Sequence, residues 1–267
     1  MQIQENLSVW DKSYVWTQAG EEWSATWGSA EAQWFGCLYP RIHNFVPAPT
    51  ILEIAPGHGR WTKYLKDLAS QLLIVDIAPN CIEACRERFL GSSHISGFVN
   101  DGMHLDMVPD GSVDFAFSVD SLVHAESDVL ESYVAEMSRK LAPEGVGFFH
   151  HSNLGEYAQQ LDSGKMTGSH GRAPSMTAEK FAMYCAQFNL ACIGQEIVNW
   201  GSEELTDCFS VFTRKGSRWD RPNLIHRNGG FMAEAAVLRS LSPLYCDAAW
   251  PEEAARRTLL SALDSVG

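Results

Sequence analysis

Short apolar runs and amphipathic segments take turns between residues 50 and 150 of this chain. A short apolar run that ends at Gly, Pro, Asp or Asn predicts a buried strand, and apolar residues at every third or fourth position predict an amphipathic helix. Strands that alternate with helices build a parallel sheet that is covered on both faces. The expected strands are Thr50–Ala55, Leu72–Asp76, Ile95–Val99, Val113–Val119 and Val146–His150.

The segments that flank this alternation carry other patterns. Residues 1–49 space their aromatic side chains by three, four and seven positions, which predicts amphipathic helices that cover the core. The core continues to residue 215 through a helix that Ser175 or Thr177 caps. It ends with two more expected strands, Ala191–Trp200 and Cys208–Thr213. Residues 216–267 are expected as a C-terminal helical extension, with helices at Phe231–Leu241 and Glu252–Leu263.

Together these patterns predict the α/β fold class. We expect a doubly wound, mostly parallel sheet over residues 50–215, a helical N-terminal cover over 1–49 and a helical extension over 216–267. Apolar helices outside the core indicate a homo-oligomer. Ligands of such folds bind at the carboxyl ends of the strands, so the candidate site lies there.

Composition and charge narrow the possible partners. The net charge of −13 opposes binding to nucleic acid, which needs clustered Lys and Arg. No apolar run approaches the roughly 20 residues of a membrane span. The first residues lack the basic and apolar regions of a secretory signal, and the seven cysteines are scattered, as is typical of reduced thiols. We therefore expect a cytoplasmic protein that acts on a small molecule or a glycan.

A glycine turn follows the first expected strand. The apolar run Ile51–Ile54 ends in Pro56-Gly57-His58-Gly59, and glycines at such a turn let the backbone pass close to a ligand. A dinucleotide site would have a third glycine where Arg60 and Trp61 stand, and Glu53 would be poorly placed beside a pyrophosphate. A carboxylate there suits a ligand with cationic groups, such as the sulfonium and amino groups of S-adenosylmethionine.

Two carboxylates close the next strands. Asp76 stands at about the spacing that places a carboxylate on ribose hydroxyls. Asp101, within Asn100-Asp101-Gly102, is expected to accept a hydrogen bond from the exocyclic amine of adenine. Asn-Asp-Gly is also a strong turn signal, so a purely turn-forming role is the alternative.

These residues carry a family resemblance. The order Glu53-x-x-Pro56-Gly57-x-Gly59, Asp76, Asn100-Asp101-Gly102 and Leu141-Ala142-Pro143-Glu144-Gly145 resembles the class I S-adenosylmethionine-dependent methyltransferases over residues 50–215. The family more often has Gly at the position of Glu144. The donor-binding residues that this resemblance and the strand ends imply are Glu53, Ala55, Gly57, Gly59, Arg60, Asp76, Asp101, Gly102 and Ser118.

A narrower resemblance concerns the methyl acceptor. Five segments are similar to a group of bacterial sugar and polysaccharide O-methyltransferases: Trp27–Arg41, Phe117–Glu126, Phe148–Asn153, Arg172–Met176 and Phe209–Trp219. This resemblance implies O-methyl transfer to a sugar, a polysaccharide or a glycosylated metabolite. Trp27 and Trp34 are expected to stack on the acceptor, and Arg172 is expected to clamp it.

Transfer to a hydroxyl requires a general base, and histidine suits this role at neutral pH. His124, His150 and His151 lie at or just beyond expected strand ends, and Asp120 precedes His124 by about one helical turn, where it could orient the ring. Because neighbours on a strand point to opposite faces, the sequence leaves His150 and His151 equally open as the base.

A metal ion and other activities stay open as alternatives. Mg²⁺ could bind Asp120, His151 and Asp207 together with acceptor hydroxyls, as some sugar methyltransferases use it. The acceptor could instead be an oxygen or nitrogen of a non-sugar natural product. A nicotinamide-dependent dehydrogenase and a sensor of adenosyl ligands that catalyses no reaction are the remaining alternatives.

Overall fold

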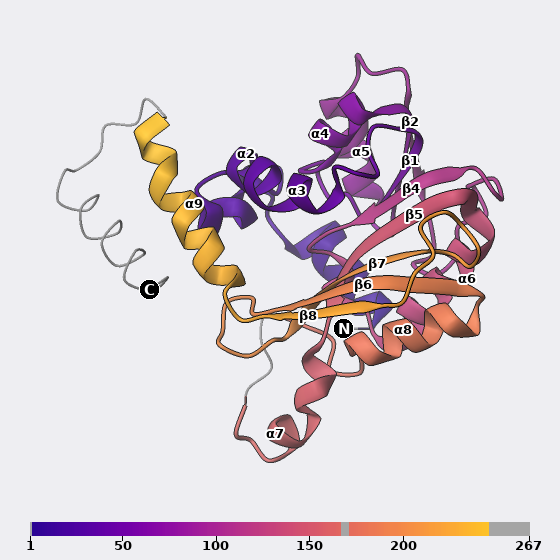
Figure 1. Cartoon of the computed structure of the whole chain (residues 1–267). Helices are drawn as coiled ribbons and strands as arrows, with labels where there is room; N and C mark the ends of the chain where they lie inside the picture. Colours follow the sequence, from indigo (N-terminus) through magenta and orange to yellow (C-terminus); the bar gives the residue numbers. More distant parts are fainter. Residues whose placement is uncertain (1, 167–170, 246–267) are drawn as a thin grey trace.

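The computed structural model describes residues 2–166 and 171–245, in which eight strands form one sheet (Figure 1). The strand order is β3-β2-β1-β4-β5-β7-β6-β8. The pairs among β1 to β5 are parallel, β7 runs antiparallel to both of its neighbours, and β8 runs parallel to β6. The strands are β1 Ala48–Ile54, β2 Ala69–Asp76, β3 Ile95–Val99, β4 Val113–Ser118, β5 Leu141–Ser152, β6 Leu190–Val198, β7 Asp207–Arg214 and β8 Leu224–Asn228. The predicted fold class, a mostly parallel α/β sheet, is confirmed.

Helices cover both faces of this sheet (Figure 1). Helices α6 and α8 pack on one face, whereas α4, α5 and the N-terminal helices α2 and α3 lie on the other. None of the helices in the described ranges is long and apolar enough to cross a membrane. The helices are α1 Ile3–Ser8, α2 Ala30–Gln33, α3 Tyr39–Ile42, α4 Thr62–Leu65, α5 Pro79–Arg88, α6 Ser127–Lys140, α7 Ala158–Asp162, α8 Ala178–Gln187 and α9 Phe231–Tyr245.

The central strands are buried on both faces, which explains their nearly continuous apolar sequences. In β1, Leu52 and Ile54 join the core beneath α6 and α8, whereas Ile51 joins the core beneath the N-terminal helices. The same alternation places Phe149 and Phe148 of β5 in opposite cores. It continues to the carboxyl end of β5, where the two adjacent histidines therefore point to opposite faces of the sheet.

Some elements differ from the sequence predictions. Strand β8 lies within the segment that was expected to be helical; it forms an exposed sheet edge, so it lacks the apolar alternation that marks a buried strand. The helix expected at Phe231–Leu241 is present as α9, and the one expected at Glu252–Leu263 lies outside the described residues. Thr177, not Ser175, caps α8, because its side chain accepts a hydrogen bond from the Lys180 backbone N–H.

Candidate active site

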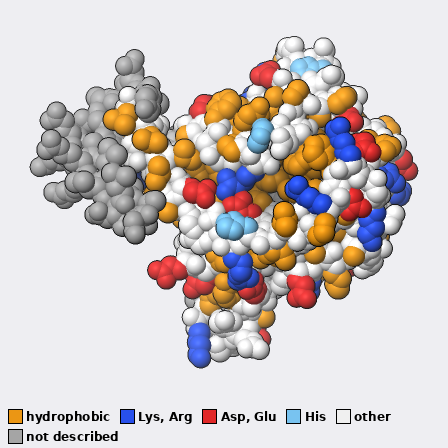
Figure 2. Space-filling model, viewed as in Figure 1, with side chains coloured by type: hydrophobic (Ala, Val, Ile, Leu, Met, Phe, Trp, Pro, Cys, Tyr) orange, Lys and Arg blue, Asp and Glu red, His pale blue; other side chains and the backbone are white. Residues whose placement is uncertain are grey.

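A cavity of about 550 Å³ opens at the carboxyl ends of β1, β2 and β4. This is the edge at which doubly wound sheets bind ligands, and the volume suits a ligand of cofactor size. The N-terminal segment from Ile3 to Thr26 contributes much of its lining, so the predicted cover also builds the cavity. On the face of the molecule seen in Figure 2, basic side chains are scattered among acidic ones and do not gather into a stripe.

The glycine turn forms one wall of this cavity. Ala55, Gly57 and Gly59 all have positive φ angles, of 57°, 56° and 83°. A Cβ atom at Gly57 would lie 2.7 Å from the ring of Trp16, and one at Gly59 would lie 2.6 Å from the ring of Phe89. In this structure the two glycines therefore make room for aromatic rings, and Gly57 remains in the cavity lining beside Trp16.

Asp76 lines the cavity at the end of β2. Its Oδ2 accepts a hydrogen bond from the Gly57 N–H at 3.2 Å, and its Oδ1 accepts one from the Ala78 N–H at 2.9 Å. Each carboxylate oxygen can accept a second hydrogen bond. Burial raises the pKa of Asp76 to about 6. The placement suits the predicted ribose contact, because two backbone N–H groups hold the Asp76 carboxylate in a fixed position at the cavity wall.

The other carboxylate predicted for the donor, Asp101, lies apart from the cavity lining. Its side chain is 57% exposed, and it accepts hydrogen bonds from the backbone N–H groups of Met103 and His104 and contacts the His104 ring at 2.6 Å. Asp101 thus forms the turn after β3, the alternative that the Asn-Asp-Gly sequence allows. Its neighbour Gly102 does line the cavity, against Ile3.

Glu53 and Ser118 are fully buried behind the cavity wall. Glu53 accepts a hydrogen bond from the Thr62 hydroxyl at 2.6 Å through Oε2, whereas its Oε1 has no partner within the described residues. Burial raises the pKa of Glu53 to about 8. Neither side chain reaches the cavity in this structure, so their expected contacts with the donor stay predictions.

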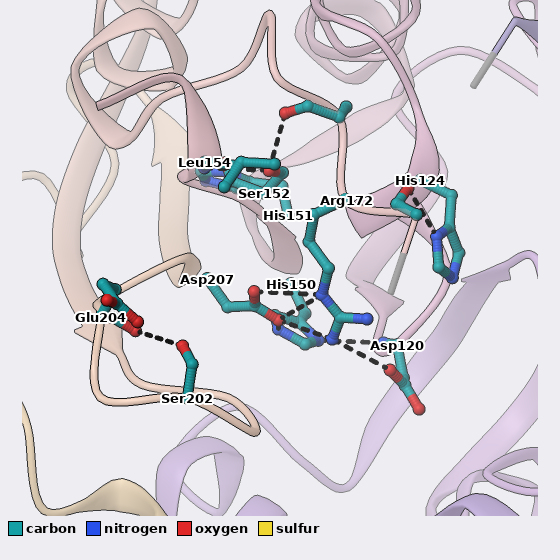
Figure 3. A network of polar contacts seen from close by, with 12 residues as sticks. Asp120, His124, His150, His151, Ser152, Leu154, Arg172, Ser202, Glu204 and Asp207 are labelled. Atoms are coloured by element: carbon teal, nitrogen blue, oxygen red, sulfur yellow. Dashed lines mark hydrogen bonds and ion pairs between the residues drawn. The ribbon is translucent and has the colours of Figure 1, made fainter. Parts of the chain in front are cut away.

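A buried ionic network adjoins the cavity, and Figure 3 shows its members Asp120, His150, Arg172 and Asp207. The Nη2 of Arg60 donates to Asp120 at 2.8 Å, and Arg172 bridges Asp120, at 3.9 Å, and Asp207, at 2.8 Å. Burial favours the neutral acid at Asp120, but the charges of Arg60 and Arg172 outweigh it and hold the pKa of this carboxyl below its usual range. Arg60, predicted to contact the donor, lines the cavity and joins the glycine turn to Asp120, so the donor contact stays a prediction.

His150 belongs to this network and not to the cavity lining. The Asp120 backbone N–H donates to its Nδ1 at 3.1 Å, so the ring proton resides on Nε2, which donates to Asp207 at 3.0 Å. Both ring nitrogens are therefore engaged by the protein. Its ring also packs against Trp200 and Phe209. The basic electron pair of His150 already accepts the Asp120 N–H in this geometry, which disfavours His150 as the predicted general base.

His151 points to the opposite face of the sheet, into the core beneath α8. Its ring stacks on Phe181 at 4.5 Å, its Nδ1 lies 2.9 Å from the Ser152 carbonyl, and its Nε2 lies 2.8 Å from the Ser210 hydroxyl. Burial lowers the pKa of His151 to about 4. Strand alternation turns His151 away from the cavity, which disfavours it as the predicted base.

His124 is the one of the three predicted histidines that lines the cavity. It ends the short 3₁₀ helix η5 (Leu122–His124), and its Nδ1 donates to the Gly171 carbonyl at 3.0 Å. Because a carbonyl only accepts, the proton resides on Nδ1 and the basic electron pair on Nε2. Burial, and then the charge of Arg172, lower the pKa of His124, so the ring is neutral at neutral pH.

Trp27 and Trp34, predicted to stack on the acceptor, are buried and stand outside the lining. Trp27 packs on Trp200 and Phe231, and Trp34 stacks on Tyr64 at 4.9 Å, so both stabilise the cover. Other indole rings take the predicted place beside the cavity. They belong to Trp10, Trp16, Trp23, Trp61 and Trp200.

Comparisons with known proteins show which family the central part of the chain matches. Residues 51–145 match the family model of the methyltransferase domain. The chain contains a class I S-adenosylmethionine-dependent methyltransferase domain. None of the curated proteins compared with the chain matches it.

Solved structures of methyltransferases share the fold. The N-methyltransferase NodS from Bradyrhizobium japonicum WM9, in complex with S-adenosyl-L-homocysteine, is 17% identical, with a TM-score of 0.54 over 80% of this chain and 96% of that one. The complex of DhpI with SAH is 19% identical, with a TM-score of 0.53 over 80% and 97%. A SAM-dependent methyltransferase from Leishmania major is 10% identical, with a TM-score of 0.58 over 79% and 82%.

The metal ligands predicted for this methyltransferase do not converge. Asp120 and Asp207 both face Arg172, whereas the side chain of His151 lies on the opposite face of the sheet. The described residues contain no group of three His, Cys, Asp or Glu side chains arranged to hold a metal ion. Because a guanidinium occupies the space between the two carboxylates, these three residues do not fit Mg²⁺, and no step is assigned to it.

Several lining residues of the methyltransferase were not predicted as part of the site. Asn6 and Trp10 come from the N-terminal segment, and Trp200 and Met232 come from segments beyond the matched domain. The density of tryptophans in residues 1–49 signalled a role for that segment, but spacing alone could not tell which rings face the cavity. The sequence around Trp200 did not indicate a place at the cavity, because Trp200 belongs to the connection between β6 and β7 and reaches the cavity only in the folded sheet.

Proposed function

We propose that this methyltransferase transfers the methyl group of S-adenosylmethionine to a hydroxyl of a small acceptor, with His124 as the general base. One observation supports this proposal above the others: of the three predicted histidines within the described residues, His124 lines the cavity, whereas His150 and His151 lie outside it. His150 and His151 have both nitrogens engaged by protein groups. An acceptor that needs no deprotonation would not require such a group.

The donor would bind beside the glycine turn. Asp76 would accept hydrogen bonds from the ribose hydroxyls through its carboxylate oxygens, and Gly57 and Gly102 would line the adjacent wall. S-adenosylmethionine, when bound, supplies a methyl group on a positively charged sulfur. The carboxylate of Asp76 brings negative charge to this part of the cavity, which favours a cationic donor, whereas Arg60 and Arg172 balance the charge of Asp120.

His124 would remove the hydroxyl proton of the acceptor as the new oxygen–carbon bond forms and the carbon–sulfur bond breaks. The ring becomes protonated on Nε2 while Nδ1 keeps its hydrogen bond to the Gly171 carbonyl, so that bond holds the ring in place in both states. The proton then passes to solvent when the product leaves. The lowered pKa of His124 favours this release and keeps the resting ring neutral.

For the acceptor class we propose a sugar-like polyol. Trp10, Trp23 and Trp200 offer flat faces, and Asp120 and Arg172 offer an acceptor and donors at the same end of the cavity. Aromatic faces combined with charged hydrogen-bonding groups suit rings with several hydroxyls. The alternative acceptor is an oxygen or nitrogen of a non-sugar natural product. Such an acceptor would contact the same aromatic faces but would not need hydrogen bonds to Asp120 and Arg172.

The test compares His124→Gln with His43→Gln across a panel of mono- and oligosaccharides, phenols and amines. His43 is an exposed histidine outside the lining, so it controls for loss of an imidazole. Loss of a general base lowers kcat by about 10²–10⁴-fold, with S-adenosylhomocysteine binding unchanged by calorimetry. Equal kcat in the two variants would contradict the base assignment, and turnover confined to phenols or amines would contradict the polyol acceptor.

A further inference from the structure

We propose that Asn6 and Trp10 are positioning residues that fix the imidazole of His124 for proton removal. This inference rests on the proposed function, because it concerns the residue that serves as the base. It assigns to the N-terminal segment a role in the reaction itself, beyond covering the cavity.

The contacts form a short chain from the segment to the histidine. The side-chain amide of Asn6 donates to the His124 carbonyl at 3.3 Å, and Trp10 Nε1 donates to Asn6 Oδ1 at 3.3 Å. The Trp10 ring lies against the His124 ring, with centroids 5.4 Å apart. Asn6 is buried, and all three side chains line the cavity. One segment thus contacts both the backbone and the ring of His124.

Two further contacts hold His124 at its backbone and at one ring nitrogen. The Gly171 carbonyl fixes one end of the ring, and the His124 backbone N–H closes η5 by donating to Ser121. Neither of these two contacts by itself limits tilting of the ring about its bond to Gly171. The Trp10 face blocks that tilt, and Asn6 holds the carbonyl of the same residue. Misplacing a reacting group by about 1 Å costs up to about 100-fold in rate.

The segment keeps an anchor that is independent of His124. Asp11 accepts a hydrogen bond from the Asn80 backbone N–H at 3.0 Å, and its carbonyl accepts one from the Asn80 side chain at 2.7 Å. A substitution at Asn6 or Trp10 therefore removes the contact with His124 while the segment stays attached to α5. Gln4 is exposed on the same helix as Asn6, so it provides a matched control.

The experiment compares Asn6→Ala, Trp10→Ala, Trp10→Phe and Gln4→Ala. Asn6→Ala is expected to lower kcat about tenfold, and Trp10→Ala about 10–100-fold, with the donor KM unchanged. Trp10→Phe keeps a ring against His124 and is expected to recover most of the loss, whereas Gln4→Ala leaves kcat as in the parent chain. Circular dichroism and thermal unfolding report whether each variant is folded.

The pH profile of kcat separates positioning from a purely structural role. Arg172, Asp120 and Asp207 are the charged groups that act on His124, and none of them is changed in these variants. Removing the Trp10 ring exposes the imidazole to water, so the acid limb of kcat and the titration of His124 followed by NMR both move to higher pH in Trp10→Ala. Trp10→Phe should move them less.

The outcomes distinguish this inference from the proposed function. If His124→Gln keeps full activity, the base assignment fails and the positioning role fails with it. If His124→Gln is inactive while folded Asn6→Ala and Trp10→Ala keep the parent kcat and pH profile, the positioning role alone is overturned. A rise in acceptor KM with kcat unchanged would also overturn it, since the segment would then only bind the acceptor.

Discussion

Arg60 donates to Asp120 at 2.8 Å, and both side chains are less than a tenth exposed. This ion pair joins the residue that follows the glycine turn to the end of β4. The other nitrogen of the guanidinium lies 3.4 Å from the Ser24 hydroxyl of the N-terminal cover. The glycine turn, the segment that follows β4 and the N-terminal cover therefore meet at one arginine, which gives this position a structural role that a glycine could not fill.

Replacing Arg60 by Met is expected to lower the free energy of unfolding by about 3–5 kcal/mol, because it leaves the buried Asp120 carboxylate with one partner fewer. The double variant Arg60→Met/Asp120→Asn should lose less than the sum of the single changes. Urea unfolding measures both. Arg86→Met, which removes an exposed ion pair with Glu83, serves as the control and should cost less than about 1 kcal/mol. Strict additivity would show that the pair is not coupled.

Replacing Asp76 by Asn is expected to weaken binding of S-adenosylhomocysteine about 10–100-fold, since hydrogen bonds to a charged group contribute about 1.5–3 kcal/mol. Isothermal calorimetry provides the dissociation constant. Asp101→Asn is the matched control at the next strand end, and its affinity should stay within about threefold because the carboxylate faces its own turn. A larger loss at Asp101 than at Asp76 would restore the predicted adenine contact.

Acid sensitivity of the fold should decrease in His151→Gln. Burial lowers the pKa of His151 to about 4, whereas an unfolded histidine titrates near 6.5. Below about pH 6.5 the unfolded chain binds a proton that the folded chain does not. The stability contributed by the neutral ring is thus present above that pH and is lost as pH falls toward 4, by on the order of 3 kcal/mol. Unfolding free energies between pH 4 and 7 check this, and kcat at neutral pH should change little.

Trp23→Ala and Trp27→Ala should separate binding from stability. Trp23 lines the cavity and is 43% exposed, so its removal should raise the acceptor KM with little change in unfolding free energy. Trp27 is buried against Trp200 and Phe231, and its removal should cost about 3–5 kcal/mol. Thermal unfolding and steady-state kinetics on the same pair of variants provide the answer. An unchanged acceptor KM in Trp23→Ala would place the acceptor elsewhere.

The core elements could be predicted from sequence because each carried its own local signal. The apolar run before Pro56 gave β1, and the run before Asp76 gave β2, with ends within a few residues of those observed. Strand β8 could not be predicted in the same way. Leu224 and Ile225 are exposed at a sheet edge, and a strand that buries little leaves no pattern of alternating burial in its sequence.

The site was harder to predict because it depends on register and on distant segments. His150 and His151 are equivalent in sequence, and only the pairing of β5 with β7 shows that one joins Asp207 and the other Ser210. Asp101 and Asp76 both end a strand, yet local hydrogen bonds turn the first away from the cavity. His124 was among the predicted bases, but the contacts that distinguish it come from the N-terminal segment and Gly171.

The crowding of indole rings around the cavity has an optical consequence. Trp10, Trp16, Trp23, Trp61 and Trp200 line it, which is five of the nine tryptophans in the chain. Trp16 also stacks on His58 at 4.3 Å, beside Gly57. The intrinsic emission of the protein therefore originates largely from the walls of its own site. Entry of a donor or an acceptor should change that emission without any added label, so each binding step can be timed in the natural chain.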